Sequence, residues 1–365
     1  MIRTVEAFLM PHIRYFLNKG YDVGVAANTE NSDVSRIEEF GVTIHHVPFS
    51  RKLFDKGNLK SYKIMKNIMK DYHILHLHTP ISSFITRLAS SKSHKVIYNV
   101  HGFHFNENGK WTTNQLYLAT EKIAALKSDK IIITNLDDLK IAYKIASEKK
   151  ICYVNGVGLD TNLYNIEKFL SQDKQTIKLE LGLDQNKKIL THIAEFNDNK
   201  RQIDIVNACE LLKEKTQDFI ILLVGTGENF EGIQRYIQEK HLDKFIKCLG
   251  FRKDIPRILS VTDIGLLVSI REGLPRSIME MMAMKVPVVA TNIRGNRDLV
   301  TNGENGFLIP IKNREEIAKK CFVLMSNEDL SNQYGEVGRQ IIEDYFSIET
   351  VLQQMEKVYR ELDIV

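Results

Sequence analysis

The sequence of 365 residues has few of the features that mark membrane-spanning, secreted or metal-binding proteins. No run of about 18 apolar residues occurs, so we expect no membrane-spanning helix. Arg3 and Glu6 interrupt the brief apolar stretch at the start, which therefore does not resemble a signal peptide. The four cysteines lie far apart and without metal-ligand spacing: Cys152, Cys209, Cys248 and Cys321. We expect them to be buried, reduced thiols of a cytoplasmic protein.

An excess of one charge sign is also missing, because 50 Lys and Arg residues against 46 Asp and Glu residues leave a formal net charge of +4. Such a balance suits a protein that meets phosphate groups or an anionic surface. The basic residues lack interleaved aromatic residues, which argues against nucleic-acid binding. The length fits two α/β domains of ordinary size.

What the sequence does contain is an alternation of short apolar runs with amphipathic stretches of helical period. The expected strands of a first series are Asp22–Ala27, Val42–Val47, His73–His78, Lys95–Val100 and Lys130–Thr134. Those of a second series are Lys188–Ala194, Phe219–Val224, Ile264–Ser269 and Val286–Ala290. Near-continuous apolar strands separated by helices predict an α/β fold with parallel sheets covered on both faces. Because the alternation restarts after residue 165, we expect two doubly wound, Rossmann-like domains.

The pattern predicts three parts, a first domain at 1–164, a second at 165–345 and a terminal helix at 346–365. Two glycines in Asn155–Tyr164 mark an irregular crossing between the domains. The apolar stripe of Ile348–Leu362 needs a surface to cover, and either domain offers one. A helix is expected at Ala7–Asn18, with Pro11 kinking it or delaying its start. The first strand of the first domain is therefore absent or very short.

The most informative segment is Ser269–Ala283, because it follows a buried strand and so lies where doubly wound folds bind ligands. Gly273 permits a sharp turn and close approach of the backbone to a ligand. Pro275 suits the first turn of a helix whose free amides face an anion such as a diphosphate. Glu272 in the turn and Glu280 in the helix are candidates to bind sugar and ribose hydroxyls. Two glutamates eight apart also arise by chance, and the helix dipole alone favours a glutamate near a helix start.

Two other segments end strands at the same expected edge. Gly225 and Gly227 close the run Ile221–Glu228, where glycines also serve plain chain reversal. Lys200 and Arg201 follow the strand Lys188–Ala194, and cations there would neutralise a leaving diphosphate. A solvated pair of charges is the alternative.

Seven stretches of the chain, in this order, resemble the family 4 retaining glycosyltransferases of the GT-B fold, most closely those of bacterial exopolysaccharide or capsule synthesis. They are HTPISSFITRLA (His78–Ala89), NVHGFHF (Asn99–Phe105), NGVGLD (Asn155–Asp160), AEFNDNK (Ala194–Lys200), LGFRKDI (Leu249–Ile255), REGLPRSIMEMMA (Arg271–Ala283) and VPVVATNIRGNRDLVTNGENGFLI (Val286–Ile309). The resemblance implies two Rossmann-like domains facing across a cleft, with the acceptor on the first domain and the nucleotide sugar on the second. It also implies that the last helix returns to the first domain.

The resemblance implies roles position by position. Glu272 matches the glutamate that faces the donor sugar, Glu280 the one that binds ribose, and Lys200 the cation that holds the diphosphate. His101 matches a histidine that approaches the donor sugar from the first domain. Gly273 and Leu274 match backbone positions beside the donor sugar and phosphate, and Arg252 to Ile255 match the loop beside the base. The catalytic candidates are therefore His101, Glu272 and Lys200, and the donor-binding candidates are Glu280, Gly273, Leu274, Pro275, Arg201, Gly225, Gly227, Arg252 and Ile255.

Many members of the resembling family carry an arginine for the diphosphate where this chain has Glu195. Lys200 is then the main cation for the diphosphate, and Arg201 is a candidate to replace the missing arginine. His101 is also open to a simpler interpretation, because histidines at sheet edges often cap backbone groups. His76 and His78 share one side of a strand as an expected buried polar pair, and no third ligand at metal spacing accompanies them.

The implied activity is transfer of a hexose or N-acetylhexosamine, with retention, from a nucleotide sugar to a growing polyprenyl-linked polysaccharide. UDP is expected as the nucleotide by resemblance alone. No cofactor or metal is expected, since members of this fold act without one and the sequence has no Asp-x-Asp pair. The chain is then cytoplasmic and peripheral on the inner face of the membrane. A sugar-nucleotide epimerase of the same fold and a non-catalytic nucleotide-sugar-binding protein remain alternatives.

Residues 51–70 carry seven basic side chains against one acidic residue: Arg51, Lys52, Lys56, Lys60, Lys63, Lys66 and Lys70 against Asp55. A shared helical face of lysines is typical of a solvated basic helix. It also suits docking on an anionic bilayer, which the polyprenyl-linked acceptors of the resembling family favour.

Overall fold

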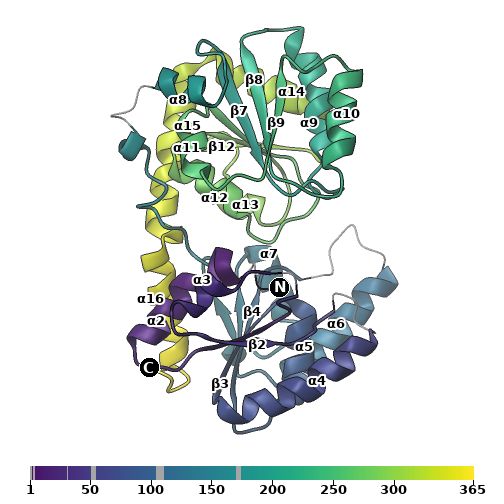
Figure 1. The fold of residues 1–365 in the computed structure, drawn as a ribbon, viewed down its shortest axis with the longest axis vertical. Coiled ribbons are helices and arrows are strands. Elements are labelled where there is room, and N and C mark those ends of the chain that lie inside the picture. The colour runs from purple at the N-terminus through teal and green to yellow at the C-terminus, as the bar shows by residue number, and fades with distance from the viewer. Residues whose placement is uncertain (1, 3–4, 31, 51–54, 104–110, 170–173) are drawn as a thin grey trace. The chain divides into compact units, whose positions relative to one another are not determined.

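The computed structural model describes residues 2, 5–30, 32–50, 55–103, 111–169 and 174–365. The chain forms two compact units and passes between them twice. The first unit comprises Met1–Gly158 and Ile348–Val365, and the second comprises Leu159–Ser347 (Figure 1). The crossings therefore fall at 158–159 and 347–348. The sequence pattern had predicted them near 164 and 346, a few residues away.

The second unit is built on one six-stranded parallel sheet in the order β12-β11-β10-β7-β8-β9. Its strands are β7 (Lys188–Ile193), β8 (Phe219–Val224), β9 (Ile246–Gly250), β10 (Ile264–Leu267), β11 (Val288–Thr291) and β12 (Gly306–Ile309). The strand order reverses between β7 and β10, which makes this a doubly wound sheet with its switch point between those strands. Every residue of β8 is buried, as a parallel sheet covered on both faces requires.

Helices cover both faces of this sheet (Figure 1). One face carries α9 (Gln202–Lys213), α10 (Phe230–Glu239) and α14 (Arg314–Ser326). The other face carries α11 (Ile255–Ser260), α12 (Arg276–Ala283), α13 (Asn296–Leu299) and the π-helical turn η5 (Ile342–Phe346). The remaining elements are η4 (Ile166–Phe169), α8 (Lys174–Glu180) and α15 (Glu328–Ile341). Two buried layers on one parallel sheet confirm the predicted architecture of this unit.

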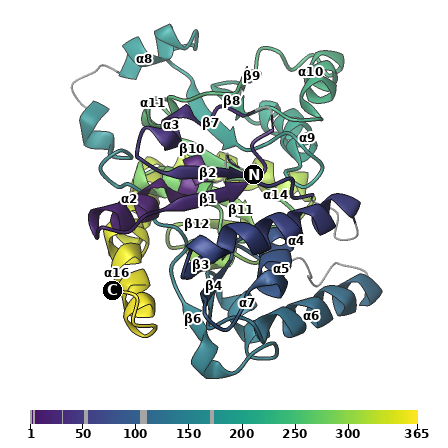
Figure 2. The ribbon, with the colours of Figure 1, turned by 60° about the horizontal axis from the view of Figure 1, so that its bottom comes forward.

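The first unit contains two separate parallel sheets. The strands β1 (Gly24–Ala27) and β2 (Thr43–His46) form one pair, and β3 (Ile74–His78), β4 (Lys95–Val100), β5 (Lys130–Ile133) and β6 (Ile151–Tyr153) form the other sheet in that order. Its helical elements are η1 (Val5–Leu9), α2 (Met10–Asn18), α3 (Ser35–Glu38), α4 (Lys56–Ile68), η2 (Met69–Asp71), α5 (Pro80–Ala89), α6 (Trp111–Ala125), α7 (Leu136–Ala142) and η3 (Glu148–Lys150). Figures 1 and 2 both show α4, α5 and α6 on one side of this unit and α2 on the other.

The start of the chain is helical where the structure describes it. In the part of the chain that the structure describes, no strand precedes β1, and the π-helical turn η1 leads directly into α2. The α-helix begins at Met10 rather than at Ala7, with Pro11 in its first turn. Proline fits there because the first-turn amides have no partner within the helix.

The last helix, α16 (Ile348–Arg360), packs on the first unit, next to α2 (Figures 1 and 2). Its stripe of Val351, Met355 and Tyr359 is buried against Ile97 and Ile132 of the four-stranded sheet. Without this helix that face of β4 and β5 would be exposed to water. The apolar pattern alone left the choice of domain open, and the structure confirms the return of this helix to the first unit that the resemblance implied.

The cysteines are free thiols, as expected. Cys209 and Cys321 are buried, and burial raises the pKa of each thiol to about 12. Cys152 and Cys248 are only half-buried, so the expectation of burial was wrong for these two. Among the described residues, no helix is both long enough and apolar enough to cross a membrane.

Candidate active site

The switch point of the second unit brings together two charged residues that the sequence singled out separately. Lys200 follows β7 and Glu272 follows β10, the two strands between which the sheet order reverses. The Lys200 Nζ lies 2.5 Å from Glu272 Oε1, and their side chains are only 21% and 11% exposed. Because both strands end at the same sheet edge, residues 72 positions apart become direct neighbours.

Local hydrogen bonds hold the two loops in this arrangement. The side-chain oxygen of Asn197 accepts from the amides of Asn199 and Lys200, each at 3.1 Å, and closes a tight turn after β7. Asn199 in turn donates from Nδ2 to the Arg271 carbonyl at 2.9 Å and accepts from the Ile270 amide at 2.9 Å. The loop that carries Lys200 is thereby bonded to the loop that carries Glu272.

Glu280 lies in α12 and is buried. Its Oε1 accepts from the Tyr164 hydroxyl at 2.8 Å and from Arg276 Nε at 2.9 Å. Burial raises the pKa of Glu280, opposed by the charge of Arg276 and by the hydrogen bonds from Tyr164 and Arg276. These two groups are therefore the ones that favour the carboxylate form.

The sequence interpretation overlooked both partners of Glu280. Arg276 stands four positions before it, the spacing of a helical ion pair, so a signal for it was present. Tyr164 stands 116 positions before it, and nothing in the sequence marks that contact. Arg339 of α15 anchors this segment by donating to the carbonyl oxygens of Tyr164 and Ala283.

The amino end of α12 lies beside Glu272, but the helix starts one residue later than expected. Pro275 is the residue before the first turn, with an extended backbone (ψ 115°), and Arg276 is the first helical residue. Pro275 itself is therefore not in the first turn. Pro275, the N-cap residue, makes no side-chain hydrogen bond to this helix start. First-turn amides have no partner within their own helix, and such a helix start suits an anion.

The chain around Gly273 and Leu274 is held by a tight backbone contact. Gly295 has a left-handed backbone (φ 78°), and a Cβ there would collide with the Gly273 carbonyl and press on the Leu274 amide. Arg294 donates from Nε to the Glu272 carbonyl at 3.3 Å. The loop after β11 thus positions the loop after β10. The sequence analysis had assigned no role to Arg294 or Gly295.

The other donor-binding candidates have structural partners of their own. Gly225 has a positive φ of 135°, and a Cβ on it would collide with the Ala194 carbonyl. A Cβ on Gly227 would collide with the Phe196 carbonyl. The two glycines therefore let the loop after β8 approach the loop after β7, which is sufficient reason for their presence. A contact with the donor stays a prediction.

The two predicted arginines each form a two-pronged ion pair with a nearby aspartate. Arg201 binds Asp204 at 2.8 and 2.6 Å, and Arg252 binds Asp254 at 2.8 and 2.6 Å. Those aspartates offset their charge, so Arg201 is a weaker substitute for a missing phosphate cation than the sequence suggests. Ile255 begins α11 and packs, half-buried, on the core.

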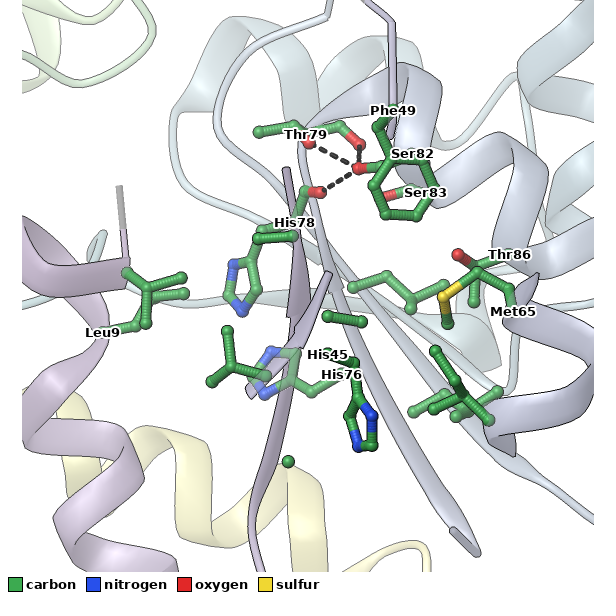
Figure 3. Close-up of a pocket in the computed structure, with 18 of the residues that line it drawn as sticks. Leu9, His45, Phe49, Met65, His76, His78, Thr79, Ser82, Ser83 and Thr86 are labelled. Carbon is green, nitrogen blue, oxygen red and sulfur yellow. Dashed lines mark hydrogen bonds between the residues drawn. The ribbon is translucent and has the colours of Figure 1, made fainter. Parts of the chain in front are cut away.

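In the first unit, His101 follows β4 and contacts His78 at the end of the neighbouring strand β3. The distance from His101 Nε2 to His78 Nδ1 is 2.9 Å, and the rings stack at 5.2 Å. His76 lies 4.6 Å from His78, ring to ring (Figure 3), which confirms that the two form a pair, but both residues are half-buried rather than buried. The His78–His101 contact had been missed, although both residues end adjacent parallel strands.

The pKa values of these histidines are all lowered. Burial, reinforced by the charge of His12, lowers the pKa of His101 to about 4, and burial lowers the pKa of His76 to about 3. His101 is thus a neutral imidazole at pH 7, so it can act as a hydrogen-bond donor or acceptor and not as a cation. In the described residues, no three His, Cys, Asp or Glu side chains converge to hold a metal ion.

These features define the class of protein. Two α/β units with parallel sheets, and a charged pair beside a helix start at the switch point of the second unit, are features of a glycosyltransferase of the GT-B fold. The model of the family Glycosyl transferases group 1 matches residues 173–341, and that of Glycosyl transferase 4-like matches residues 2–135. The chain belongs to these group 1 glycosyltransferases, the GT4 family.

Individual relatives agree with this assignment. The chain is 30% identical over 361 residues to the putative glycosyltransferase EpsD of Bacillus subtilis, covering 97% of this chain and 93% of the relative. It is 27% identical over 315 residues to the Escherichia coli UDP-Gal:α-D-GlcNAc-diphosphoundecaprenol α-1,3-galactosyltransferase, covering 84% and 79%.

Solved structures show the same fold. A glycosyltransferase of Rickettsia africae superposes with a TM-score of 0.80 at 22% identity, covering 98% of this chain and 94% of that one. The Anabaena protein HepE, solved in complex with UDP, superposes with a TM-score of 0.77 at 19% identity, covering 93% and 92%.

Proposed function

We propose that this glycosyltransferase moves a sugar, with retention, from a UDP-sugar to a growing lipid-linked polysaccharide. The observation that carries the proposal is the Lys200–Glu272 pair at the switch point, beside the uncapped start of α12. A cation and free amides suit a diphosphate, and carboxylates suit sugar hydroxyls. This second unit is then the donor domain and the first unit the acceptor domain.

The names of relatives support the proposed substrate class. HepE was solved with UDP and also with UDP-glucose. The Escherichia coli relative is named for a UDP-sugar donor, a diphosphoundecaprenol-linked acceptor and an α-linked product. Other relatives are named for capsular polysaccharide and amylovoran biosynthesis. The names of HepE and of the Escherichia coli relative support a UDP-sugar donor, and that of the Escherichia coli relative supports an acceptor carried on a lipid diphosphate.

The donor-binding steps follow from the charges at the switch point. The diphosphate binds at the start of α12 and competes with Glu272 for the ammonium group of Lys200. Glu272, released from that ion pair, accepts hydrogen bonds from hydroxyls of the donor sugar. Glu280, kept in its carboxylate form by Tyr164 and Arg276, accepts from the ribose hydroxyls.

The transfer step breaks the bond between the anomeric carbon and the diphosphate oxygen, and the electron pair leaves with the diphosphate. The acceptor hydroxyl oxygen bonds to the anomeric carbon on the same face, and its proton passes to the departing phosphate oxygen. Configuration is thereby retained without a protein nucleophile. Lys200 and the helix amides stabilise the developing negative charge, and neutral His101 donates a hydrogen bond to the donor sugar. No metal takes part in these steps.

Transfer assays on Lys200→Met and Glu272→Gln test this proposal, with UDP-hexoses and UDP-N-acetylhexosamines as donors and polyprenyl-diphosphate-linked sugars as acceptors. Removal of one preorganised donor of charge stabilisation lowers kcat about 10²–10³-fold. The matched control is Lys240→Met, which removes a Lys–Glu pair between α9 and α10 at 3.2 Å and leaves turnover unchanged. Normal turnover by the Lys200 or Glu272 variant would contradict the assigned roles.

The same assays separate this proposal from its two alternatives. Conversion of the UDP-sugar into an epimer without any acceptor would identify an epimerase instead. Tight binding of UDP-sugars with no turnover on any acceptor would identify a non-catalytic binder. An α-configured product, read from the anomeric proton coupling in NMR, supports retention, and a β-configured product refutes it.

The exposed surface of the first unit suits a peripheral position on the inner face of an anionic membrane. The lysines of α4 are all exposed: Lys56, Lys60, Lys63 and Lys66, with Lys70 just beyond the helix. Arg51 and Lys52 lie outside the described residues. Leu59 of α4, Trp111 of α6 and Leu126 just after α6 are 71–79% exposed. Cations near large apolar side chains fit lipid headgroups and the acyl boundary below them.

Sedimentation with vesicles tests the membrane surface. Each lysine near an anionic bilayer contributes about 1 kcal/mol, so the triple variant K60E/K63E/K66E loses binding to phosphatidylglycerol vesicles. The control variant K213E/K215E/K240E changes as many exposed or half-buried lysines of the second unit and keeps its binding. Equal binding to neutral phosphatidylcholine vesicles, or loss in the control, argues against an anionic surface at α4.

A further inference from the structure

Basic residues follow both strands that neighbour β10 in the sheet of the second unit. β10 lies between β7 and β11, so the loops after β7 and β11 flank the loop that leads from β10 into α12. The loop after β7 carries Lys200, and the loop after β11 carries Arg294. The helix α13, which begins just after Arg294, packs on α12 (Figure 1). The loop after β10 therefore has a basic residue on each side.

Lys200 and Arg294 contact the same residue, Glu272, at different groups. The Lys200 ammonium lies 2.5 Å from the Glu272 carboxylate, and Arg294 Nε donates to the Glu272 carbonyl at 3.3 Å. A guanidinium carries several N–H donors, so one arginine can hold a carbonyl oxygen and a phosphate oxygen at the same time. Arg294 is half-buried, as are Lys200 and Glu272. The two cations thus belong to one cluster at the switch point.

The loop after β11 is fixed firmly to the end of β10. Thr291 Oγ1 donates to the Ser269 carbonyl at 2.6 Å, and Asn296 Nδ2 donates to the Thr291 carbonyl at 2.8 Å. Gly295 lies so close to Gly273 that a Cβ on Gly295 would stand 2.0 Å from the Gly273 carbonyl oxygen. The arginine that precedes this glycine is therefore held in place before any ligand binds, as preorganised electrostatic stabilisation requires.

The charges on the β7 side of this edge do not offset a diphosphate. Lys200 is shared with Glu272, and Arg201 lies 2.6 Å from Asp204. Glu195, exposed on the loop after β7, adds a negative charge to that side. A nucleoside diphosphate carries more negative charge than one ammonium group offsets, and an ammonium group beside a carboxylate offsets less. A cation from the β11 side would make up this difference.

We propose that Arg294 is a second diphosphate-binding residue of this glycosyltransferase, and that it holds the donor phosphates from the β11 side while Lys200 holds them from the β7 side. This inference rests on the proposed function, because it takes the start of α12 as the diphosphate site. A planar guanidinium can bind two phosphate oxygens, which orients the diphosphate as well as offsetting its charge. During transfer, the same contact stabilises the negative charge that collects on the leaving diphosphate.

Ligands that differ only in their phosphates test this assignment in the full chain. Ligand-observed NMR titration, which also measures weak binding, compares uridine, UMP and UDP on the parent chain and on Arg294→Gln. Loss of a hydrogen bond to a charged group weakens UDP binding about 10–100-fold, whereas uridine, which has no phosphate, binds both proteins equally. In transfer assays the variant also loses kcat, because the contact strengthens as the leaving group gains charge.

Two further variants separate the charge of Arg294 from its support of the loop. Arg294→Lys keeps the charge without the planar fork, and it retains more UDP affinity than Arg294→Gln. Arg297→Gln is the matched control, because it removes an exposed arginine three positions further on, whose Nη1 donates to the Asn292 carbonyl. This control keeps the parent's affinity for all three ligands.

Equal weakening of uridine and UDP binding in Arg294→Gln would overturn the proposal, because the arginine would then only support the loop. A loss of UDP affinity in Arg271→Gln, on the loop after β10, with none in Arg294→Gln would assign the second cation to Arg271 instead. Absence of UDP binding by the parent chain would refute the proposed donor and this inference with it. UDP binding that weakens in Lys200→Met but not in Arg294→Gln would refute this inference alone.

Discussion

The hydroxyl of Tyr164 is the most informative single group to remove, because it donates one of the two hydrogen bonds that favour ionised Glu280 over its buried, protonated form. A hydrogen bond to a charged group contributes about 1.5–3 kcal/mol, and 1.36 kcal/mol corresponds to one pKa unit. The Tyr164→Phe variant therefore raises the pKa of Glu280 further, and the remaining hydrogen bond and charge of Arg276 oppose this rise in part.

The sign of the pH effect follows from which form binds the donor. Ribose hydroxyls donate to the carboxylate, so UDP affinity is kept at high pH and lost as pH falls through the pKa of Glu280. In Tyr164→Phe this loss of UDP affinity begins at a higher pH than in the parent chain. Stability behaves oppositely, because a carboxyl whose pKa is raised on folding contributes stability at low pH that is lost as pH rises through the folded pKa. The variant is thus destabilised more at neutral pH than in acid.

Calorimetric titration of UDP between pH 5 and pH 8 measures this shift directly, together with steady-state KM and kcat. We expect about tenfold weaker UDP binding where Glu280 protonates in the variant, a raised donor KM and a nearly unchanged kcat. Tyr236→Phe, which removes a hydroxyl 2.9 Å from Asn207 on the distant α9–α10 contact, serves as the control. A pH profile of UDP binding identical to that of the parent chain would refute the role of Tyr164 as a positioning residue.

Three further predictions follow from the structure. Gly225→Ala forces a side chain into a backbone carbonyl at positive φ and lowers Tm strongly, whereas Gly232→Ala inside α10, with open space around it, stabilises by about 0.5–1 kcal/mol in thermal unfolding. Because the pKa of His101 is lowered to about 4, the dependence of kcat on this group is flat from pH 5 to 8, and an inflection between those values that disappears in His101→Asn contradicts its neutrality. Arg87→Met leaves Glu121 as a buried charge without its 2.9 Å partner, which costs about 3–5 kcal/mol in chemical denaturation; a loss under 1 kcal/mol would show that the pair is not desolvated.

The predicted strands were found wherever the sequence carries a nearly unbroken apolar run, as in Lys95–Val100 and Phe219–Val224. Three strands had not been predicted: β6, β9 and β12. All three lie at the edge of a sheet. Much of β6 and β9 is only half-buried, so their side chains need not be continuously apolar, and a local pattern does not reveal them.

The candidate site divides in the same way. Glu272, Glu280 and Lys200 were recognisable because each follows or enters an element at a position typical of ligand binding, and the structure joins the first and last of them in one ion pair. Tyr164 was not recognisable, since its contact with Glu280 spans 116 positions. Pro275 was placed one residue too far into the helix, an error at the element boundary where sequence patterns are least specific.

Sequence alone therefore determined which segments become strands and helices, that the sheets are parallel, and which charged residues end strands at the binding edge. These properties depend on periodicity and on residues close together along the chain. Tertiary structure alone decided that Lys200 pairs with Glu272, that Tyr164 supports Glu280, and that the described strands of the first unit divide into two sheets. The order of strands in a sheet brings distant residues together, and that order is set by the burial of whole faces, which no single stretch of sequence contains.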